Sequence, residues 1–318
     1  MRRLWMDCDT GFDDALAMIV VSRATDYHLV GISTVVGNTS LENTTANTLA
    51  VVEAFGIEAP VYRGAAKPLA QDPQTIEDLL GGAAMGTVGR AFPPAARRTV
   101  EPLDAISALV RALEAGPLTI LGTGPLTNIA MALNLRPDLA DRVERLVFMG
   151  GSATTGNHTA AAEFNTFADP ESLDAVLRSG IPIEMFGLNV TRQVPIRTAE
   201  EDALRASGQP HAALLADHVG FYLRMIDKVT PRPMALHDPT AAAYLAWPQL
   251  FELQDVRMAV ELHGTHTRGE TVCEFRVPRK GQPNARAAVC ADGEEVMRRV
   301  LDVLLGARWA PDGQEEAT

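Results

Sequence analysis

Four carboxylates crowd into eight residues near the start of the chain, and they are Asp7, Asp9, Asp13 and Asp14. The apolar residues from Leu4 to Met6 predict the end of a buried strand, and the apolar run from Ala15 to Val21 predicts a helix. The acidic stretch therefore falls in a strand-to-helix turn, where open α/β sheets bind their ligands. Like charges are crowded in a folded protein only when something compensates them, and for carboxylates this is usually a cation. The turn is a candidate active site.

The spacing within this turn separates two roles. Asp13 and Asp14 are neighbours at the predicted helix start, so their side chains leave the helix axis in different directions. One can face a metal ion while the other faces a substrate or a water. Gly11 is expected to let the backbone make the tight bend. The alternative is that one acid merely caps the helix, but a cap needs one carboxylate and the chain supplies four.

Strands and helices alternate along most of the chain. The predicted strands are residues 4–9, 29–36, 118–122, 145–149 and 183–186. The predicted helices are residues 13–24, 41–55, 103–114, 126–134, 171–178, 200–206 and 211–228. This alternation predicts an α/β fold with a mostly parallel central sheet and helices on both faces.

The C-terminal third has a different pattern. Residues 256–262 and 271–277 predict a small antiparallel addition, between helices expected at 238–246 and 294–305. No stretch is long enough to act as a linker, so we expect one domain over residues 1–310. The polar residues 311–318 are expected to be a disordered tail.

Composition and charge exclude several classes of function. The net charge of −12 and the absence of a Lys/Arg-rich block argue against nucleic-acid binding. The three cysteines have no metal-site spacing and no disulfide framework, which favours a reducing compartment. Acids interrupt the N-terminal apolar run by residue 7, unlike a signal peptide, and no apolar stretch reaches the ~20 residues of a membrane span. We expect a cytoplasmic protein without a membrane or nucleic-acid partner.

Residues 71–98 are rich in Gly and Pro and poor in periodic apolar positions. This pattern predicts a long irregular loop, of a length that usually has a function or is disordered. A lid that excludes water from a small-ligand site is one interpretation, and a surface excursion without function is the other.

The acidic turn resembles the opening motifs of two families. The strand followed by Asp-x-Asp is similar to haloacid-dehalogenase-type phosphatases. The complete run Asp7-x-Asp9-x-Gly11-x-Asp13-Asp14-Ala15 resembles more closely the inosine-uridine-preferring nucleoside hydrolases. Seven later segments match that second family in order and spacing, and they lie at residues 35–39, 121–130, 149–151, 156–165, 168–172, 187–191 and 237–241. The resemblance extends from about residue 3 to residue 305.

The resemblance implies a Ca²⁺-dependent hydrolysis of the N-glycosidic bond of purine or pyrimidine ribonucleosides, for nucleoside catabolism and base salvage. It implies one Ca²⁺ per chain, bound by the carboxylates of Asp9, Asp14 and Asp238 and by the backbone carbonyl of Thr123. Asp13 would be the general base that activates the Ca²⁺-bound water. A homodimer or homotetramer is expected on the same ground.

The other implied site residues surround the sugar and the base. The resemblance places six side chains around the ribose, which are Asn38, Met149, Asn157, Glu163, Asn165 and Asn189. His237 is expected on the base side, where it would donate a proton to the leaving group. The base is expected to contact residues 71–98 and 221–236. Many pyrimidine-preferring members carry a His-Gly motif in the first of these segments, and this chain has no histidine between His28 and His158.

Two other functions remain open from the sequence. The first is a Mg²⁺-dependent phosphatase with Asp7 as nucleophile. It would need a Thr or Ser, a Lys and a further acidic pair at other strand ends, and these cannot be assembled convincingly. The second is a nucleoside- or ribose-binding protein without catalysis, which would have no need of a spare carboxylate such as Asp13.

Overall fold

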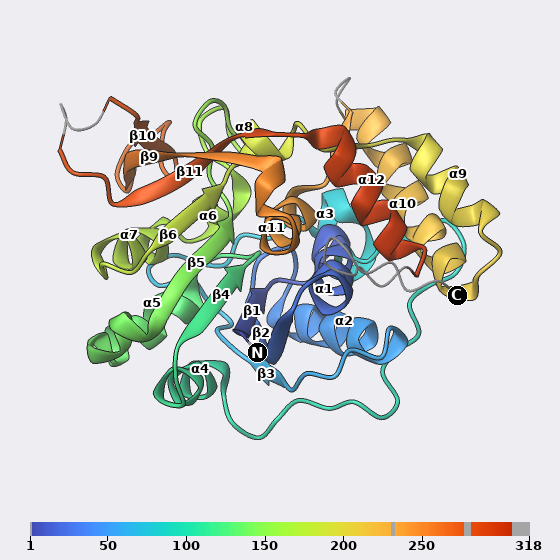
Figure 1. Ribbon diagram of the computed structural model, residues 1–318, viewed down its shortest axis with the longest axis horizontal. Helices are drawn as coiled ribbons and strands as arrows, with labels where there is room; N and C mark the ends of the chain where they lie inside the picture. The colour runs from blue at the N-terminus through green and yellow to red at the C-terminus, as the bar shows by residue number, and fades with distance from the viewer. Residues whose placement is uncertain (1, 230–232, 277–280, 307–318) are drawn as a thin grey trace.

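The computed structural model describes residues 2–229, 233–276 and 281–306 (Figure 1). Its main sheet has nine strands in the order β10-β9-β11-β6-β5-β4-β1-β2-β3. These strands are β1 (Arg2–Cys8), β2 (Tyr27–Thr34), β3 (Val61–Arg63), β4 (Leu118–Gly122), β5 (Val143–Met149), β6 (Ile183–Phe186), β9 (Phe251–Val260), β10 (Thr271–Glu274) and β11 (Ala285–Ala291). A separate two-stranded antiparallel sheet joins β7 (Pro195–Ile196) to β8 (Met234–Ala235).

The longer helices are α1 (Phe12–Ala24), α2 (Leu41–Ala54), α4 (Ala105–Glu114), α5 (Thr127–Leu135), α7 (Pro170–Arg178), α9 (Thr198–Ala206), α10 (Pro210–Val229), α11 (His237–Ala246) and α12 (Gly293–Leu304). The short helical segments are α3 (Glu77–Leu80), α6 (Phe164–Ala168), α8 (Leu188–Thr191), η1 (Gly82–Ala84), η2 (Pro137–Arg142) and η3 (Pro248–Leu250). Within the described ranges, no helix is long and apolar enough to span a membrane.

The sheet is parallel over most of its width. Every neighbouring pair from β3 across to β11 is parallel, whereas β9 pairs antiparallel with both β11 and β10. The predicted fold class is therefore confirmed, including the antiparallel addition. The addition is continuous with the main sheet, because β11 pairs with β6 on one side and with β9 on the other.

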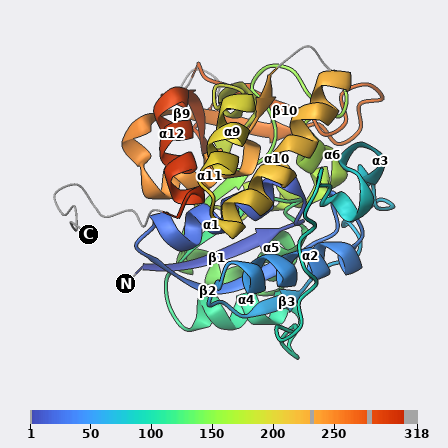
Figure 2. The same ribbon diagram turned by 90° about the vertical axis from the view of Figure 1, so that its right-hand side faces the viewer.

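Helices cover both faces of the sheet (Figures 1 and 2), and two apolar cores lie between the helices and the sheet. Helices α1, α2, α10, α11 and α12 pack in one core, and α4, α5 and α7 pack in the other. Residues Ala15 to Val21 of α1 are all buried, because this helix packs against α2, α10, α11 and α12 and against strand β2. That enclosure explains why the sequence of α1 is apolar on every side and lacks a polar face.

Most predicted elements are present, with ends that differ by a few residues. The largest difference is β11, for which the sequence predicts no strand. Its residues are mostly alanine, so they lack the β-branched and aromatic side chains that mark a strand. The short strands β3, β7 and β8 were also missed. Residue 277 of the predicted second C-terminal strand and residues 311–318 of the predicted tail lie outside the described residues, and the single domain over 1–310 stays a prediction.

The topology brings distant polar residues to one edge. Strands β1, β2, β4 and β5 are parallel neighbours, so the residues that follow them leave the sheet at the same end. These residues include Asp9 after β1, Asn38 after β2 and Thr123 after β4. The N-terminus of α11, with His237 and Asp238, lies at the same end because α11 packs against α1.

Candidate active site

The turn between β1 and α1 carries the acidic cluster. Gly11 is the N-cap of α1, and its backbone N–H donates to Asp14 Oδ2 at 2.9 Å. The φ of Gly11 is −116°, which other residues also adopt, so the tight bend is not the reason for glycine. A Cβ at this position would lie 2.8 Å from Nδ2 of Asn38. Glycine is therefore required by the close approach of Asn38, which corrects the sequence interpretation.

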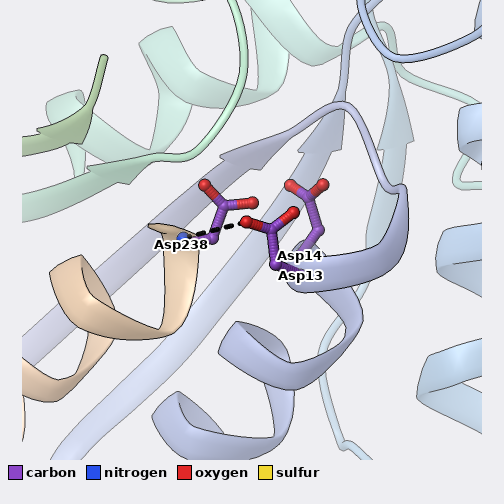
Figure 3. Close-up of side chains that lie close together, drawn as sticks. All are labelled: Asp13, Asp14 and Asp238. Atoms are coloured by element: carbon purple, nitrogen blue, oxygen red, sulfur yellow. Dashed lines mark hydrogen bonds between the residues drawn. The ribbon is translucent and has the colours of Figure 1, made fainter. Parts of the chain in front are cut away.

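Three carboxylates converge at the meeting point of two helix N-termini (Figure 3). Asp13 and Asp14 lie in the first turn of α1, and Asp238 lies in the first turn of α11, with one carboxylate oxygen from each lying within 4.8 Å of the others. The backbone N–H of Asp238 donates to Asp13 Oδ2 at 3.3 Å. Asp14 and Asp238 are buried, while Asp13 is half-buried. Residues 225 positions apart thus form one acidic cluster.

Asp9 and Thr123 adjoin this cluster. The backbone N–H of Asn38 donates to Asp9 Oδ2 at 2.7 Å, and Asp9 Oδ1 is buried with no hydrogen-bond partner among the described residues. Thr123 Oγ1 donates to Asp14 Oδ1 at 2.7 Å. The backbone carbonyl of Thr123 accepts from Asn165 Nδ2 at 2.8 Å. All four predicted metal ligands therefore lie in one neighbourhood, together with Asp13.

Burial and mutual repulsion disfavour ionisation of these acids. Burial, followed by the charge of Asp13, raises the pKa of Asp14 to about 7. Burial and then Asp14 raise the pKa of Asp9 well above its usual range. Burial and then the charges of Asp13, Asp14 and Asp9 do the same for the pKa of Asp238. The carboxylates can all be ionised near neutral pH only if a positive charge joins them.

A cavity of about 610 Å³ opens beside this cluster. Of the predicted residues, those that line it are Asp13, Asn38, Thr123, Met149, Asn157, Glu163, Asn165, His237 and Asp238. Asn189 is not among the lining residues. Its Oδ1 accepts from the backbone N–H of Ala153 at 3.1 Å, and its Nδ2 donates to the Ala288 carbonyl at 2.9 Å. Asn189 therefore ties two backbone segments together, and its sugar contact stays a prediction.

Several sugar-side residues are held by their neighbours. Nδ2 of Asn165 also donates to the Met149 carbonyl at 3.2 Å, and its distance to Met149 Sδ is 3.6 Å. Asn157 Oδ1 accepts from the backbone N–H of Phe164 at 3.0 Å. Glu163 caps α6 and accepts from the backbone N–H groups of Gly151 and Thr166, and burial raises its pKa to about 7. These contacts pre-orient polar groups on one side of the cavity.

His237 lies next to Asp238 at the start of α11. Its Nδ1 is 2.8 Å from Thr191 Oγ1, and its side chain lines the cavity. Burial lowers its pKa, the charge of Asp13 opposes this shift, and the charge of Arg192 adds a smaller lowering effect. The hydrogen bond to Thr191 fixes the orientation of the ring beside the acidic cluster.

The other wall of the cavity is largely apolar. The residues that line this wall are Phe12, Ile76, Leu79, Leu80, Tyr222, Met225, Pro233, Met234 and Ala235. They come mainly from residues 71–98 and 221–236, the two segments expected around the base. Sequence reasoning named the segments, but not the individual contacts of this wall. The predicted site residues also omit three lining residues: His158 and Phe164, which lie within the matched segment 156–165, and Arg192, which directly follows the matched segment 187–191.

Asp7 belongs to a different environment. Its Oδ1 accepts from Ser33 Oγ and from Asn128 Nδ2, and Asp7 does not line the cavity. Burial raises its pKa to about 7. A phosphatase nucleophile must face its substrate, so this placement gives no support to the phosphatase interpretation.

Comparisons with known proteins agree with this geometry. The family model for "Inosine-uridine preferring nucleoside hydrolase" matches residues 4–298. The protein of that name from Leishmania major is 35% identical over 307 residues, covering 95% of this chain and 97% of the relative. The pyrimidine-specific ribonucleoside hydrolase RihA of Enterobacter sp. (strain 638) is 35% identical over 294 residues, covering 90% and 92%.

A solved structure has the same fold. The purine-preferring ribonucleoside hydrolase from Gardnerella vaginalis has a TM-score of 0.89 and 29% identity, and the match covers 96% of this chain and 98% of that one. The three relatives differ in the base that their names give. What they share is the splitting of a nucleoside, and the match extends along nearly the whole of each chain. The chain therefore belongs to the inosine-uridine preferring nucleoside hydrolase family and is a nucleosidase, an enzyme that hydrolyses N-glycosyl bonds.

Proposed function

We propose that the protein hydrolyses purine and pyrimidine ribonucleosides to ribose and free base, with Ca²⁺ as its cofactor and Asp13 as its general base. The observation that carries the proposal is the uncompensated acidic cluster beside a cavity with one polar and one apolar wall. A ribose suits the polar wall because its hydroxyls need donors and acceptors. A nucleobase suits the apolar wall because its faces are apolar.

The acidic cluster fits a hard cation. Asp9 Oδ1 is buried without a hydrogen-bond partner among the described residues, and burial together with the neighbouring carboxylates raises the pKa values of Asp14 and Asp238. Ca²⁺ accepts six to eight oxygen ligands, including carboxylates and backbone carbonyls. Asp9, Asp14, Asp238 and the Thr123 carbonyl would hold it. Bound there, the cation would supply positive charge for the sugar hydroxyls and would acidify a water.

Asp13 is the acid best placed for proton transfer. It lines the cavity and is half-buried, whereas Asp9 and Asp14 are fully buried. Its Oδ2 accepts from the backbone N–H of Asp238, which orients the carboxylate. In the proposed reaction Asp13 takes a proton from the attacking water as the bond to the base breaks through an oxocarbenium-like transition state. Asn165 and Glu163 would orient the ribose.

His237 is proposed to assist departure of the base. It lines the cavity next to Asp238, and its ring is oriented by Thr191. A base leaves as an anion unless it receives a proton, so a donor at this position would lower the barrier. Because burial lowers the pKa of His237, the ring would carry this proton only with the help of the nearby Asp13 charge, which opposes that shift. We also propose a cytoplasmic homodimer or homotetramer, as the family resemblance implies.

The test is a steady-state panel with Ca²⁺-loaded protein. Release of reducing sugar would be measured from inosine, guanosine, adenosine, uridine and cytidine, together with phosphate release from sugar phosphates. We expect sugar release from at least one nucleoside and no phosphate release. Intact nucleoside after long incubation would contradict the proposal and favour a binding protein. Phosphate release would favour the phosphatase.

A further inference from the structure

An unusual backbone kink follows the segment 76–80, which forms part of the apolar wall of the cavity. Gly81, Ala83 and Ala84 have positive φ values of 72°, 54° and 59°. Alanine rarely adopts this left-handed region, so surrounding contacts must hold the kink. Ile76, Leu79 and Leu80, immediately before it, line the cavity. The position of this wall therefore depends on whatever holds residues 81–86.

Asn47 of α2 forms the first bridge from this kink. Its Nδ2 donates to the Ala83 carbonyl at 2.7 Å and to the Thr10 carbonyl at 2.8 Å. Thr10 lies in the acidic turn, directly before Gly11. One side-chain amide thus uses both of its N–H groups to join the wall segment to the turn that carries the carboxylates.

His218 of α10 forms a second bridge between the same two segments. Its Nδ1 is 2.9 Å from the Gly86 carbonyl and its Nε2 is 3.2 Å from the Phe12 carbonyl. The ring is fully buried and packs against Phe12 and Phe92 with centroids 5.0 Å apart in each case. Burial lowers its pKa to about 4, so the neutral ring has one N–H, which the shorter contact assigns to the Gly86 carbonyl. The ring therefore contacts the acidic turn by packing against Phe12, and its Nε2 donates no hydrogen bond to the Phe12 carbonyl.

The two bridges are parallel. One joins residue 83 to Thr10, and the other joins residue 86 to Phe12. In the acidic turn the two contacted residues therefore lie on either side of Gly11. Tyr222 strengthens the kink, since its hydroxyl lies 2.8 Å from the Ala84 carbonyl, but its ring also lines the cavity. Asn47 and His218 do not line it. Their polar atoms contact the two segments without contacting the ligand space.

We propose that Asn47 and His218 are positioning residues that hold the base-side wall at a fixed position relative to the acidic turn. The inference rests on the proposed function, because it takes the wall as the base side and the turn as the sugar side. Loss of a bridge lets the wall shift relative to the turn. Recognition of the base then weakens, while the binding of ribose and of the metal is preserved.

Two substitutions remove the bridges without leaving large cavities. Asn47→Leu removes the amide donor, and His218→Phe keeps a buried ring without polar nitrogens. Asn284→Leu is a matched control, since Asn284 is also half-buried and binds backbone, with Nδ2 2.9 Å from the Met258 carbonyl. His211→Phe is the control for α10, about two turns before His218. His218→Asn keeps a donor near the position of Nδ1 and should restore most of the function.

The kinetic measurement compares a whole nucleoside with ribose alone. For the best nucleoside of the panel, Asn47→Leu and His218→Phe should each lower kcat/KM by about tenfold, as expected for one hydrogen bond. The inhibition constant of ribose and the metal content should stay within about twofold, below the effect of one hydrogen bond. In the double variant kcat/KM should fall by more than the product of the two single fold-losses, because each single variant still keeps one bridge. Equal losses for nucleoside and ribose would overturn the proposal.

Hydrogen–deuterium exchange tests the bridges without turnover. The amide N–H groups of Ala84 and Val88 bond to the carbonyls of Gly81 and Asp217. Exchange in residues 81–88 should become faster in both bridge variants and stay unchanged in both controls. Unchanged exchange in the bridge variants would overturn the inference. Absence of ribose release from the unmodified protein would instead contradict the proposed function, so the two failures are distinguishable.

Discussion

Single carboxylates have different tasks in this site, although they are crowded together. Asp9, Asp14 and Asp238 are buried and have raised pKa values, which suits ligands of a cation. Asp13 is more exposed and faces the cavity, which suits proton transfer. The adjacent positions of Asp13 and Asp14 at a helix start predict that their side chains point in different directions and have different roles. Spacing could not bring Asp238 to them across 225 residues, and only the family resemblance pointed to it.

The metal assignment predicts the composition of the purified protein. Elemental analysis should find about one Ca²⁺ per chain, and Asp14→Ala should lose most of it, because carboxylates supply the main charge of a hard-cation site. Asp217→Ala is the control, since Asp217 is also buried but pairs with Arg205 and lies away from the cavity lining. Full occupancy in Asp14→Ala would show that the ion is bound elsewhere.

The role of His237 can be separated from general damage to the pocket. His237→Ala should slow the hydrolysis of inosine by roughly two orders of magnitude, the usual contribution of a proton donor. The same variant should remain close to the unmodified protein on 4-nitrophenyl riboside, whose leaving group departs without protonation. Equal losses on both substrates would mean that His237 supports Asp238 or the sugar, and does not act as an acid.

At the scale of elements, strand ends and helix starts build the site. Long periodic segments such as α4 and β4 were predictable, because their apolar patterns report burial. The alanine-rich β11 and the two-residue strands β7 and β8 were not predictable, because their pairing is decided by neighbours and not by their own residues. The apolar wall of the cavity likewise arises from tertiary packing. For that reason the sequence indicates which segments form this wall, but not which of their side chains line the cavity.

The turn between β1 and α1 yields a prediction about Gly11. In Gly11→Ala the new Cβ would lie 2.8 Å from Nδ2 of Asn38, whose backbone N–H holds Asp9. Relief of this contact should displace Asn38 and cost about 1–3 kcal/mol of unfolding free energy, as for other overpacked sites. Denaturant titration measures that loss, and Ca²⁺ titration should show weaker binding. Unchanged stability together with unchanged Ca²⁺ affinity would contradict the close approach.

At the scale of the whole molecule, the acidic cluster should govern how stability depends on pH. In the metal-free protein the pKa values of Asp14 and Glu163 are raised to about 7. In the unfolded chain both acids titrate near 4. Between these values the folded state binds more protons than the unfolded state, so unfolding free energy falls as pH rises.

The melting temperature of the metal-free protein should therefore fall between pH 5 and pH 8. A decrease of about 5 °C or more is expected, since 1 kcal/mol corresponds to roughly 2–4 °C in a protein of moderate size. Saturating Ca²⁺ should reduce this decrease, because the cation compensates the ionised carboxylates of the cluster, while the contribution of Asp7, whose pKa burial also raises to about 7, remains. Calorimetry with and without a chelator measures both curves. A metal-free protein that becomes more stable over this range would contradict the raised pKa values.

The most direct test of the whole account is the rate of ribose release by Asp13→Asn at an unchanged metal content. Asparagine is nearly isosteric with aspartate and keeps its hydrogen bonding, but it cannot take up the proton. We predict that turnover of the best nucleoside falls by roughly two to four orders of magnitude, while Ca²⁺ per chain stays the same. A turnover close to that of the unmodified protein, at equal metal content, would contradict it.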